Sequence, residues 1–241
     1  MQSGVDVSKT IFFLVKIFDD KKYATDFVSG KLFANRLSYF RKLEEAEGAN
    51  RGDRHEGVVS WLQPDQVQIV INGRTLTDLA GPVSIKKNWH DHLNVFCIYA
   101  AHSGDFKSIT HENLADFKKQ LEIPDDCLKL GKHAVLVTNF TQFIERVKSA
   151  VQENNYGLNA GLVDYYNSET FSGNFTEEEA VFKKRDEYEH QKEYRFVIDS
   201  GIEGKNPIFL DIGDISDITM HCNVADVNKY LEIKLPQDAT A

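Results

Sequence analysis

Short apolar runs separated by polar turns dominate the chain and predict a strand-rich fold. Residues 10–18 (TIFFLVKIF) are apolar almost throughout, which predicts a buried strand. Residues 19–30 place apolar side chains at helical spacing behind an acidic cap, Asp19 or Asp20, and residues 31–37 (KLFANRL) predict a second strand. The sequence therefore predicts a strand–helix–strand opening.

The rest of the chain continues this mixture, with strands more frequent in the C-terminal half. Residues 58–62, 67–73 and 74–79 predict a β-meander, in which Asn72 and Gly73 form a tight turn between the last two strands. Further strands are expected at 92–101, 133–139, 161–166, 192–199, 206–213 and 215–222, and further helices at 38–48, 110–121, 140–155, 176–191 and 223–231. We find no internal repeat, and we predict a mixed α+β fold that forms a single domain over residues 1–241.

Composition and charge narrow the class of protein. The 241 residues are 41% hydrophobic with 16 Phe, which suffices for a sizeable core, and the net charge of −9 argues against a general nucleic-acid binder. No apolar run approaches the ~20 residues of a membrane span, and the N-terminus has no basic signal region. Cys97, Cys127 and Cys222 lack the spacing of a metal site or a disulfide framework. We therefore expect a cytoplasmic protein with reduced thiols and no membrane partner.

Familiar catalytic motifs are absent from the sequence, which has no Walker A, GxGxxG, HExxH or GxSxG pattern. His90 and His92, in WHDHL, would share one face of a strand and form half of a metal site. No second cluster with ligand spacing lies nearby in the sequence, so we predict no metal site.

The segment 51–57 (RGDRHEG) concentrates ionisable groups in a loop that contains two glycines. Arg51, Asp53, Arg54 and Glu56 are therefore candidates for binding a polar ligand. The alternative is a solvated turn, in which Arg–carboxylate pairs contribute little to stability.

A second concentration of polar groups lies at residues 188–199 (YEHQKEYRFVID). Period-2 alternation places Gln191, Glu193 and Arg195 on one face of a strand. A carboxylate beside an amide suits N-glycosidic chemistry, because loss of nicotinamide from NAD passes through an oxocarbenium-like ribosyl cation that a carboxylate stabilises. The alternative, which the spacing by itself favours, is an ordinary ion pair of Glu193 at a wet strand edge.

The order of several segments resembles a large family of uncharacterised bacterial and phage proteins. These segments are FVSGKLFANRLSYFRKL, RGDRHEG, NVFCIYAA, HAVLVTNFTQF and VFKKRDEYEHQKEYRFVI, which together span roughly residues 25 to 198. The family pattern closes with an [EQ]-x-E-x-R strand, which Gln191, Glu193 and Arg195 match here.

The layout is also similar to the ADP-ribosyltransferase fold, which opens with a strand, a helix and a second strand and carries a [QE]-x-E strand at its active site. This resemblance implies that Glu193 is the catalytic glutamate and Gln191 its positioning partner. It also implies that Asn35, Ser38 and Tyr39, which follow the second predicted strand, contact the nucleotide.

The first predicted strand departs from this pattern. Most such enzymes hold NAD with an Arg or His on that strand, whereas this chain offers Lys16, a point charge without the fork of a guanidinium. Lys16 takes that role, or Arg51 or Arg54 reaches the dinucleotide, or the protein does not use NAD.

The leading hypothesis is an NAD-dependent ADP-ribosyltransferase or NAD glycohydrolase of the toxin or phage-defence type. Its substrate would be NAD, its acceptor an unidentified protein or nucleic acid, and a cognate antitoxin is a further candidate partner. One alternative is a non-enzymatic sensor or inhibitor that binds a nucleotide or nucleic acid. Another is a nuclease in which Asp53, Glu56 and Glu193 hold Mg²⁺.

Overall fold

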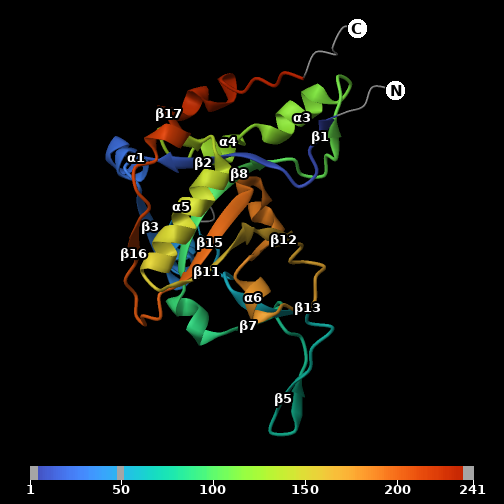
Figure 1. Cartoon of the computed structure of the whole chain (residues 1–241). Helices are drawn as coiled ribbons and strands as arrows, with labels where there is room; N and C mark the ends of the chain where they lie inside the picture. The colour runs from blue at the N-terminus through green and yellow to red at the C-terminus, as the bar shows by residue number, and fades with distance from the viewer. Residues whose placement is uncertain (1–4, 48–51, 236–241) are drawn as a thin grey trace. The chain divides into compact units, whose positions relative to one another are not determined.

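The computed structural model describes residues 5–47 and 52–235 (Figure 1). Their contacts group into two compact units. The first unit combines Met1–Leu32, Ile98–Ala150 and Asp211–Ala241, and the second combines Phe33–Cys97 and Val151–Leu210. The chain passes between the units inside four elements, which are β3 (Lys31–Arg36), β8 (Asn94–His102), α5 (Phe140–Glu153) and β16 (Ile208–Asp211). A single domain over residues 1–241 stays a prediction.

An antiparallel sheet forms the centre of the first unit. Its strand order is β8, β2, β10 and β17, in which β8 contributes its last residues. The other strands and helices of this unit are β1 (Val5–Asp6), β2 (Ile11–Phe18), β9 (Ser108–Ile109), β10 (His133–Val137), β17 (Thr219–Asn223), α1 (Lys21–Val28), α3 (Leu114–Leu121), α4 (Asp125–Leu128), η3 (Ser216–Ile218) and η4 (Val224–Lys229). Apolar side chains of β2, β8, β10 and α3 build its core, with Val15, Tyr99, Phe117 and Leu136 buried.

The predicted strand–helix–strand opening is confirmed as β2, α1 and β3. The Asp20 side chain caps α1 by accepting a hydrogen bond from the Lys22 N–H at 2.7 Å, which satisfies one of the free donors of the first turn. Gly30 follows the helix with φ +92°, a left-handed conformation that glycine adopts at little cost.

The second unit contains the strands on which the candidate site is built. β15 pairs antiparallel with β11 and also with β8, and β8 pairs with β3. A second sheet has the order β13, β4 and β7, a short parallel pair joins β12 to β14, and β5 pairs with β6. The bounds of these and the remaining elements are α2 (Leu37–Glu47), β4 (Val58–Leu62), β5 (Ile69–Ile71), β6 (Arg74–Leu76), β7 (Val83–Lys86), η1 (Asn88–His92), β11 (Gly157–Leu162), β12 (Asp164–Tyr166), β13 (Gly173–Asn174), α6 (Glu177–Ala180), β14 (Lys183–Arg185), η2 (Asp186–Gln191) and β15 (Glu193–Asp199).

The meander prediction is correct only for its second turn. β5 and β6 form the predicted hairpin, with Asn72 at φ +50° and Gly73 at φ +75°, as a type I′ turn requires. β4 does not join them and pairs instead with β7 and β13, and its side chains Val58 and Trp61 are buried in a cluster with Tyr166.

The helix predicted over residues 176–191 is wrong for most of its length. Thr176 and Glu179 form a reciprocal capping box, but the helix that it starts, α6, ends at Ala180. The chain then enters β14, because the Phe182 carbonyl accepts the Asp164 N–H at 2.8 Å and the strand pairs with β12. Long-range pairing therefore overrides the local helical propensity. Two smaller corrections are that the final predicted helix is the 3₁₀ segment η4 and that His90 and His92 lie in the 3₁₀ segment η1, not on a strand.

The Gly30 turn generates a testable prediction. A Cβ at Gly30 would overlap the backbone carbonyl of Gly213, so Gly30→Ala adds a steric conflict to the cost of a positive φ. We expect it to lower the free energy of unfolding by at least about 2 kcal/mol in urea denaturation. Gly201→Ala is the matched control, since Gly201 has φ +65° and open space around it, and a loss of about 1 kcal/mol is expected there. Equal losses in the two variants would contradict the steric argument.

Candidate functional site around Glu193

Gln191 and Glu193 converge, although not by the strand geometry that their spacing predicted. Gln191 is the last residue of η2, and Lys192 then adopts a left-handed conformation with φ +36°. Glu193 begins β15 after this turn. Both side chains nevertheless reach the Lys184 Nζ, the Gln191 Oε1 at 2.7 Å and the Glu193 Oε2 at 3.3 Å.

The Arg195 guanidinium joins Glu193 to the loop that contains Glu56. Its Nε donates to the Glu193 Oε1 at 2.6 Å, and its Nη1 and Nη2 donate to the two carboxylate oxygens of Glu56 at 2.8 and 3.0 Å. The Nη1 also donates to the Val181 carbonyl at 2.6 Å. This is the planar fork by which arginine binds a carboxylate with two parallel hydrogen bonds.

Lys184 completes a cluster of two acids and two bases. Its Nζ lies 3.5 Å from the Glu56 Oε1 and 3.3 Å from the Glu193 Oε2, and it stands 4.8 Å from the centre of the Tyr188 ring. We call Glu56, Lys184, Gln191, Glu193 and Arg195 the Glu193 cluster. Its four charged members are buried, and Glu193 is only 6% exposed.

Asp53 anchors a second ion pair beside this cluster. Its Oδ1 accepts hydrogen bonds from the Arg185 Nη2 at 3.0 Å and from the His55 backbone N–H at 2.8 Å. Arg185 also donates to the Tyr188 hydroxyl at 3.2 Å, so Tyr188 contacts both Lys184 and Arg185. The Asp53 Oδ2 is buried without a hydrogen-bond partner among the described residues.

The charges of the cluster fix its protonation state. Burial alone would raise the pKa of Glu193, but the positive charges of Arg195 and Lys184 and a hydrogen bond from Cys97 outweigh it and hold that pKa well below its usual range. Burial would lower the pKa of Lys184, yet Glu193 and Glu56 raise it. The pKa of Tyr165, whose hydroxyl accepts the Glu193 N–H at 3.0 Å, is raised by burial and by the Glu193 charge. Glu193 is therefore a carboxylate, and Lys184 an ammonium, at neutral pH.

The structure brings four of the predicted site residues together and places the others elsewhere. Gln191, Glu193, Arg195 and Glu56 belong to the Glu193 cluster, and Asp53 lies beside it. Among the other predicted residues, Arg54 and Tyr39 are exposed: the Arg54 Nε donates to the His55 Nε2, and the Tyr39 ring packs against Phe40. The Asn35 side chain accepts the Arg36 N–H, and the Ser38 hydroxyl donates to the Asp91 carbonyl. Lys16 lies on β2 of the first unit, and Arg51 lies outside the described residues.

Lys184, a member of the cluster, and Tyr188, which contacts it, are the residues that sequence reasoning missed. Residues 183–185 form strand β14, whose side chains alternate between two faces. Lys183 pairs with Asp164 on one side, and Lys184 is buried on the other. Period-2 alternation would have separated the two lysines, but only if the segment had been predicted as a strand.

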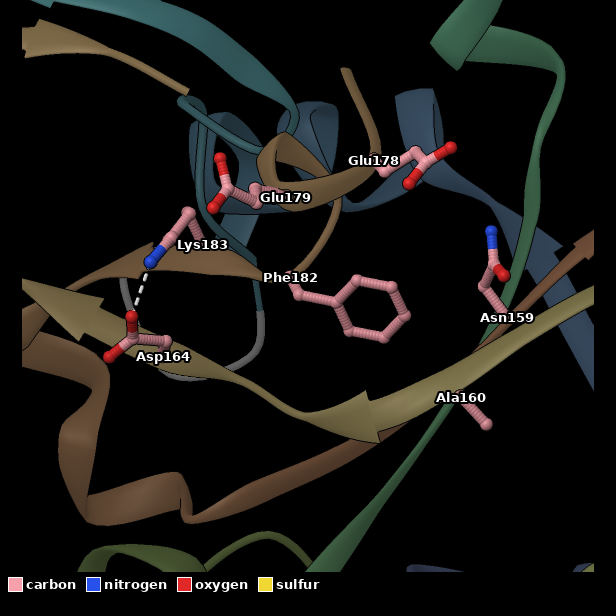
Figure 2. Close-up of a pocket in the computed structure, with 7 residues that line it drawn as sticks. All are labelled: Asn159, Ala160, Asp164, Glu178, Glu179, Phe182 and Lys183. Atoms are coloured by element: carbon pink, nitrogen blue, oxygen red, sulfur yellow. Dashed lines mark hydrogen bonds and ion pairs between the residues drawn. The ribbon is translucent and has the colours of Figure 1, made fainter. Parts of the chain in front are cut away.

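A hollow of about 380 Å³ lies on the Lys183 side of β14. Figure 2 shows the Phe182 ring between the helix that carries Glu178 and Glu179 and the strand that carries Asn159. Much of its polar lining is engaged within the protein, because Lys183 pairs with Asp164 and Glu179 caps α6. None of the residues that line this hollow belongs to the Glu193 cluster.

The carboxylates of Glu56 and Glu193 both contact the same two cations, Arg195 and Lys184. Since Arg195 and Lys184 already neutralise them, they would attract Mg²⁺ weakly, so the arrangement does not favour the nuclease hypothesis. His90 contacts the Gly57 carbonyl and His92 accepts the Gly204 N–H, so the two rings have different partners. Over residues 5–47 and 52–235, no group of three or more His, Cys, Asp or Glu side chains is arranged to hold a metal ion.

Comparison of the chain with protein-family models, with curated protein sequences and with solved structures gives no match. The mixed, strand-rich α/β fold therefore rests on the structure itself, and likeness to ADP-ribosyltransferases stays a prediction. In the part of the chain that the structure describes, no helix has the length and hydropathy needed to cross a membrane.

The ion pairs of the Glu193 cluster lead to a prediction about the free energy of unfolding when the Glu193 charge is removed. Glu193→Gln leaves Lys184 and Arg195 facing a single buried carboxylate, so we expect a loss of about 3–5 kcal/mol in the free energy of unfolding. Combining it with Lys184→Gln restores the charge balance and should recover part of the loss, as a double-mutant cycle in urea would measure. Glu189→Gln, at an exposed position of η2, is the control and should change stability by less than about 0.5 kcal/mol.

The lowered pKa of Glu193 also predicts a pH dependence. The unfolded chain, with a glutamate pKa of about 4.3, binds a proton before folded Glu193 does, so the stability that this residue contributes is present above about pH 4.3 and is lost as the pH falls. We expect the difference in unfolding free energy between wild type and Glu193→Gln to shrink between about pH 5 and pH 3. A difference that is constant over this range would show that the Glu193 pKa is not lowered.

Proposed function

We propose that the chain is an NAD-dependent ADP-ribosyltransferase or NAD glycohydrolase that acts at the Glu193 cluster. The observation that carries the proposal is the convergence of Gln191 and Glu193 on Lys184, since the resemblance assigns the positioning and catalytic roles to the first two residues. The order of β2, α1 and β3 supports the same assignment.

The two oxygens of Glu193 have different roles in this proposal. Oε1 is held by the Arg195 Nε at 2.6 Å and orients the carboxylate, whereas Oε2 meets Lys184 at the longer distance of 3.3 Å. Oε2 is therefore the oxygen that stabilises the ribosyl cation as the glycosidic C–N bond breaks and nicotinamide leaves with the bonding pair. Water or the acceptor then forms the new bond to the ribosyl carbon and loses a proton.

In this proposal NAD reaches the cluster through its most exposed member. Gln191 and Tyr165 are half-buried, whereas Glu193 and Lys184 are buried, so a ligand reaches Oε2 past the Gln191 amide. Movement of that amide away from Lys184 frees it to orient the acceptor.

Residues outside the cluster supply the remaining contacts with the dinucleotide. The Tyr39 ring is 45% exposed and offers a face for nicotinamide or adenine, and Arg54, exposed in the loop that carries Glu56, is our candidate for the pyrophosphate. Asn35 and Ser38 stay proposed contacts, and the role of Lys16, which lies in the first unit, stays a prediction of the resemblance. We further propose a cytoplasmic toxin or phage-defence role, with a macromolecular acceptor and an antitoxin as partners.

A second candidate function is favoured by the burial of Glu193. Both of its oxygens are paired and little of the side chain is exposed, which suits a structural role in a non-enzymatic protein that binds a nucleotide or nucleic acid as a sensor or inhibitor. Such a protein would bind NAD or another nucleotide and form no product.

Nicotinamide release from NAD, measured with cell lysate present to supply acceptors, tests the proposal. We expect Glu193→Gln to lower release by about 100-fold or more, because it removes the charge that stabilises the cation. The Glu193→Gln, Lys184→Gln double variant should remain equally inactive although its charges balance, and Glu189→Gln should match wild type. Turnover by a folded double variant, or no release by wild type, would remove the enzymatic proposal.

Gln191→Ala separates the positioning role from the structural one. Since Gln191 is proposed to orient the acceptor, its loss should lower transfer of labelled ADP-ribose to macromolecules more than it lowers hydrolysis to free ADP-ribose. A purely structural role would lower both products in the same proportion. The ratio of transfer to hydrolysis, at matched folded fraction by circular dichroism, is the measurement.

A further inference from the structure

The hairpin of β5 and β6 stands apart from the other strands of its unit. The two strands form a separate two-stranded sheet among the described residues, and Figure 1 shows β5 extending away from β7 and β13. A two-stranded hairpin is marginally stable in water by itself, because it buries little apolar surface. It therefore gains from contact with a further strand.

The hairpin exposes aliphatic side chains on both faces. Ile69 pairs with Leu76 across the hairpin, and Ile71 lies two residues further along the same strand, so these three side chains share one face. Ile71 is 56% exposed, Leu76 43%, and Val70, on the other face, 54%. Adjacent exposed aliphatic groups of this kind are typical of interaction surfaces.

The outer edge of β5 has a defined set of free backbone groups. In a hairpin with a two-residue turn, Ile71 and Arg74 form the hydrogen-bonded pair next to the turn, and the pairs alternate from there. Val70 and Thr75 are the next pair, so the N–H and C=O of Val70 point away from β6, toward the open edge. A strand that docks on this edge would exchange both hydrogen bonds with Val70.

The lack of charge around β5 favours a second copy of this chain as the docking strand. Residues 66–73 carry no charged side chain, although 27% of the residues in the chain are charged and its net charge is −9. Two copies of β5 can therefore pair antiparallel without placing like charges opposite one another. A two-fold axis through Val70 sets Ile69 opposite Ile71 of the second copy, which gathers four isoleucines on one face.

We propose that two copies of the chain associate through antiparallel pairing of their β5 edges, centred on Val70. The proposal goes beyond the function proposed above and does not depend on it. A strand pair buries less than the roughly 1,200 Å² of a stable complex, so the dimer is expected to be weak and dependent on concentration.

Sedimentation velocity over a wide range of protein concentrations tests the proposal, with wild type expected to shift from monomer to dimer. Val70→Pro removes the outward N–H without removing a hydrogen bond of the hairpin, since proline is tolerated where a strand N–H faces solvent. We expect it to raise the dimer dissociation constant by more than about 10-fold. Thr75→Pro is the matched control, because it removes the outward N–H of β6 and should leave the dimer unchanged.

Val70→Lys adds an independent variant that places two ammonium groups opposite one another, and it should also give monomer. Circular dichroism establishes that each variant is folded. A wild type that is monomeric at every concentration would overturn the proposal, as would a folded Val70→Pro that still dimerises like wild type. Equal losses in Val70→Pro and Thr75→Pro would do the same, because the contact would then not be specific to β5.

Discussion

The second unit depends on the hydrogen bonds of one buried guanidinium. Arg195 donates to Glu193 in its own strand, to Glu56 in the loop before β4 and to the Val181 carbonyl before β14. One planar group thus joins three segments, of which the Glu56 loop lies 139 residues away in the sequence. Each of those acceptors would be costly to bury without a donor. Lysine would supply charge at this position but not the fork, which is why the geometry requires arginine.

The same ion pairs serve and constrain the proposed chemistry. They keep Glu193 ionised, which a group that stabilises a cation must be, and they hold it in one orientation. They also neutralise it and remove it from solvent. Buried ion pairs of this kind contribute little net stability, because desolvation offsets the attraction, but they penalise any arrangement that separates the partners. The cluster therefore specifies the local fold more strongly than it stabilises it.

Local patterns in the sequence predicted the parts of the fold that depend on neighbouring residues. The Asp20 cap, the Asn72–Gly73 turn and strand β15 follow from chemistry within a few positions. The helix expected at 176–191 failed because β14 is determined by its pairing with β12, and no short-range pattern records that pairing. The site was predicted in part for the same reason: Glu193 and Gln191 were identified from one strand, whereas Lys184 becomes a partner only through tertiary structure.

The distance along the chain between Glu56 and its partner bears on the order of events during synthesis. Arg195 is 139 residues after Glu56, so the ribosome must translate most of the protein before that carboxylate finds its guanidinium. Until then we expect the loop around Glu56 to stay hydrated, because burying its carboxylate without the guanidinium would place an unpaired charge in an apolar environment. The polar centre of the second unit is thus expected to close late, and the aromatic cluster around Trp61 cannot form until Tyr166 has been synthesised.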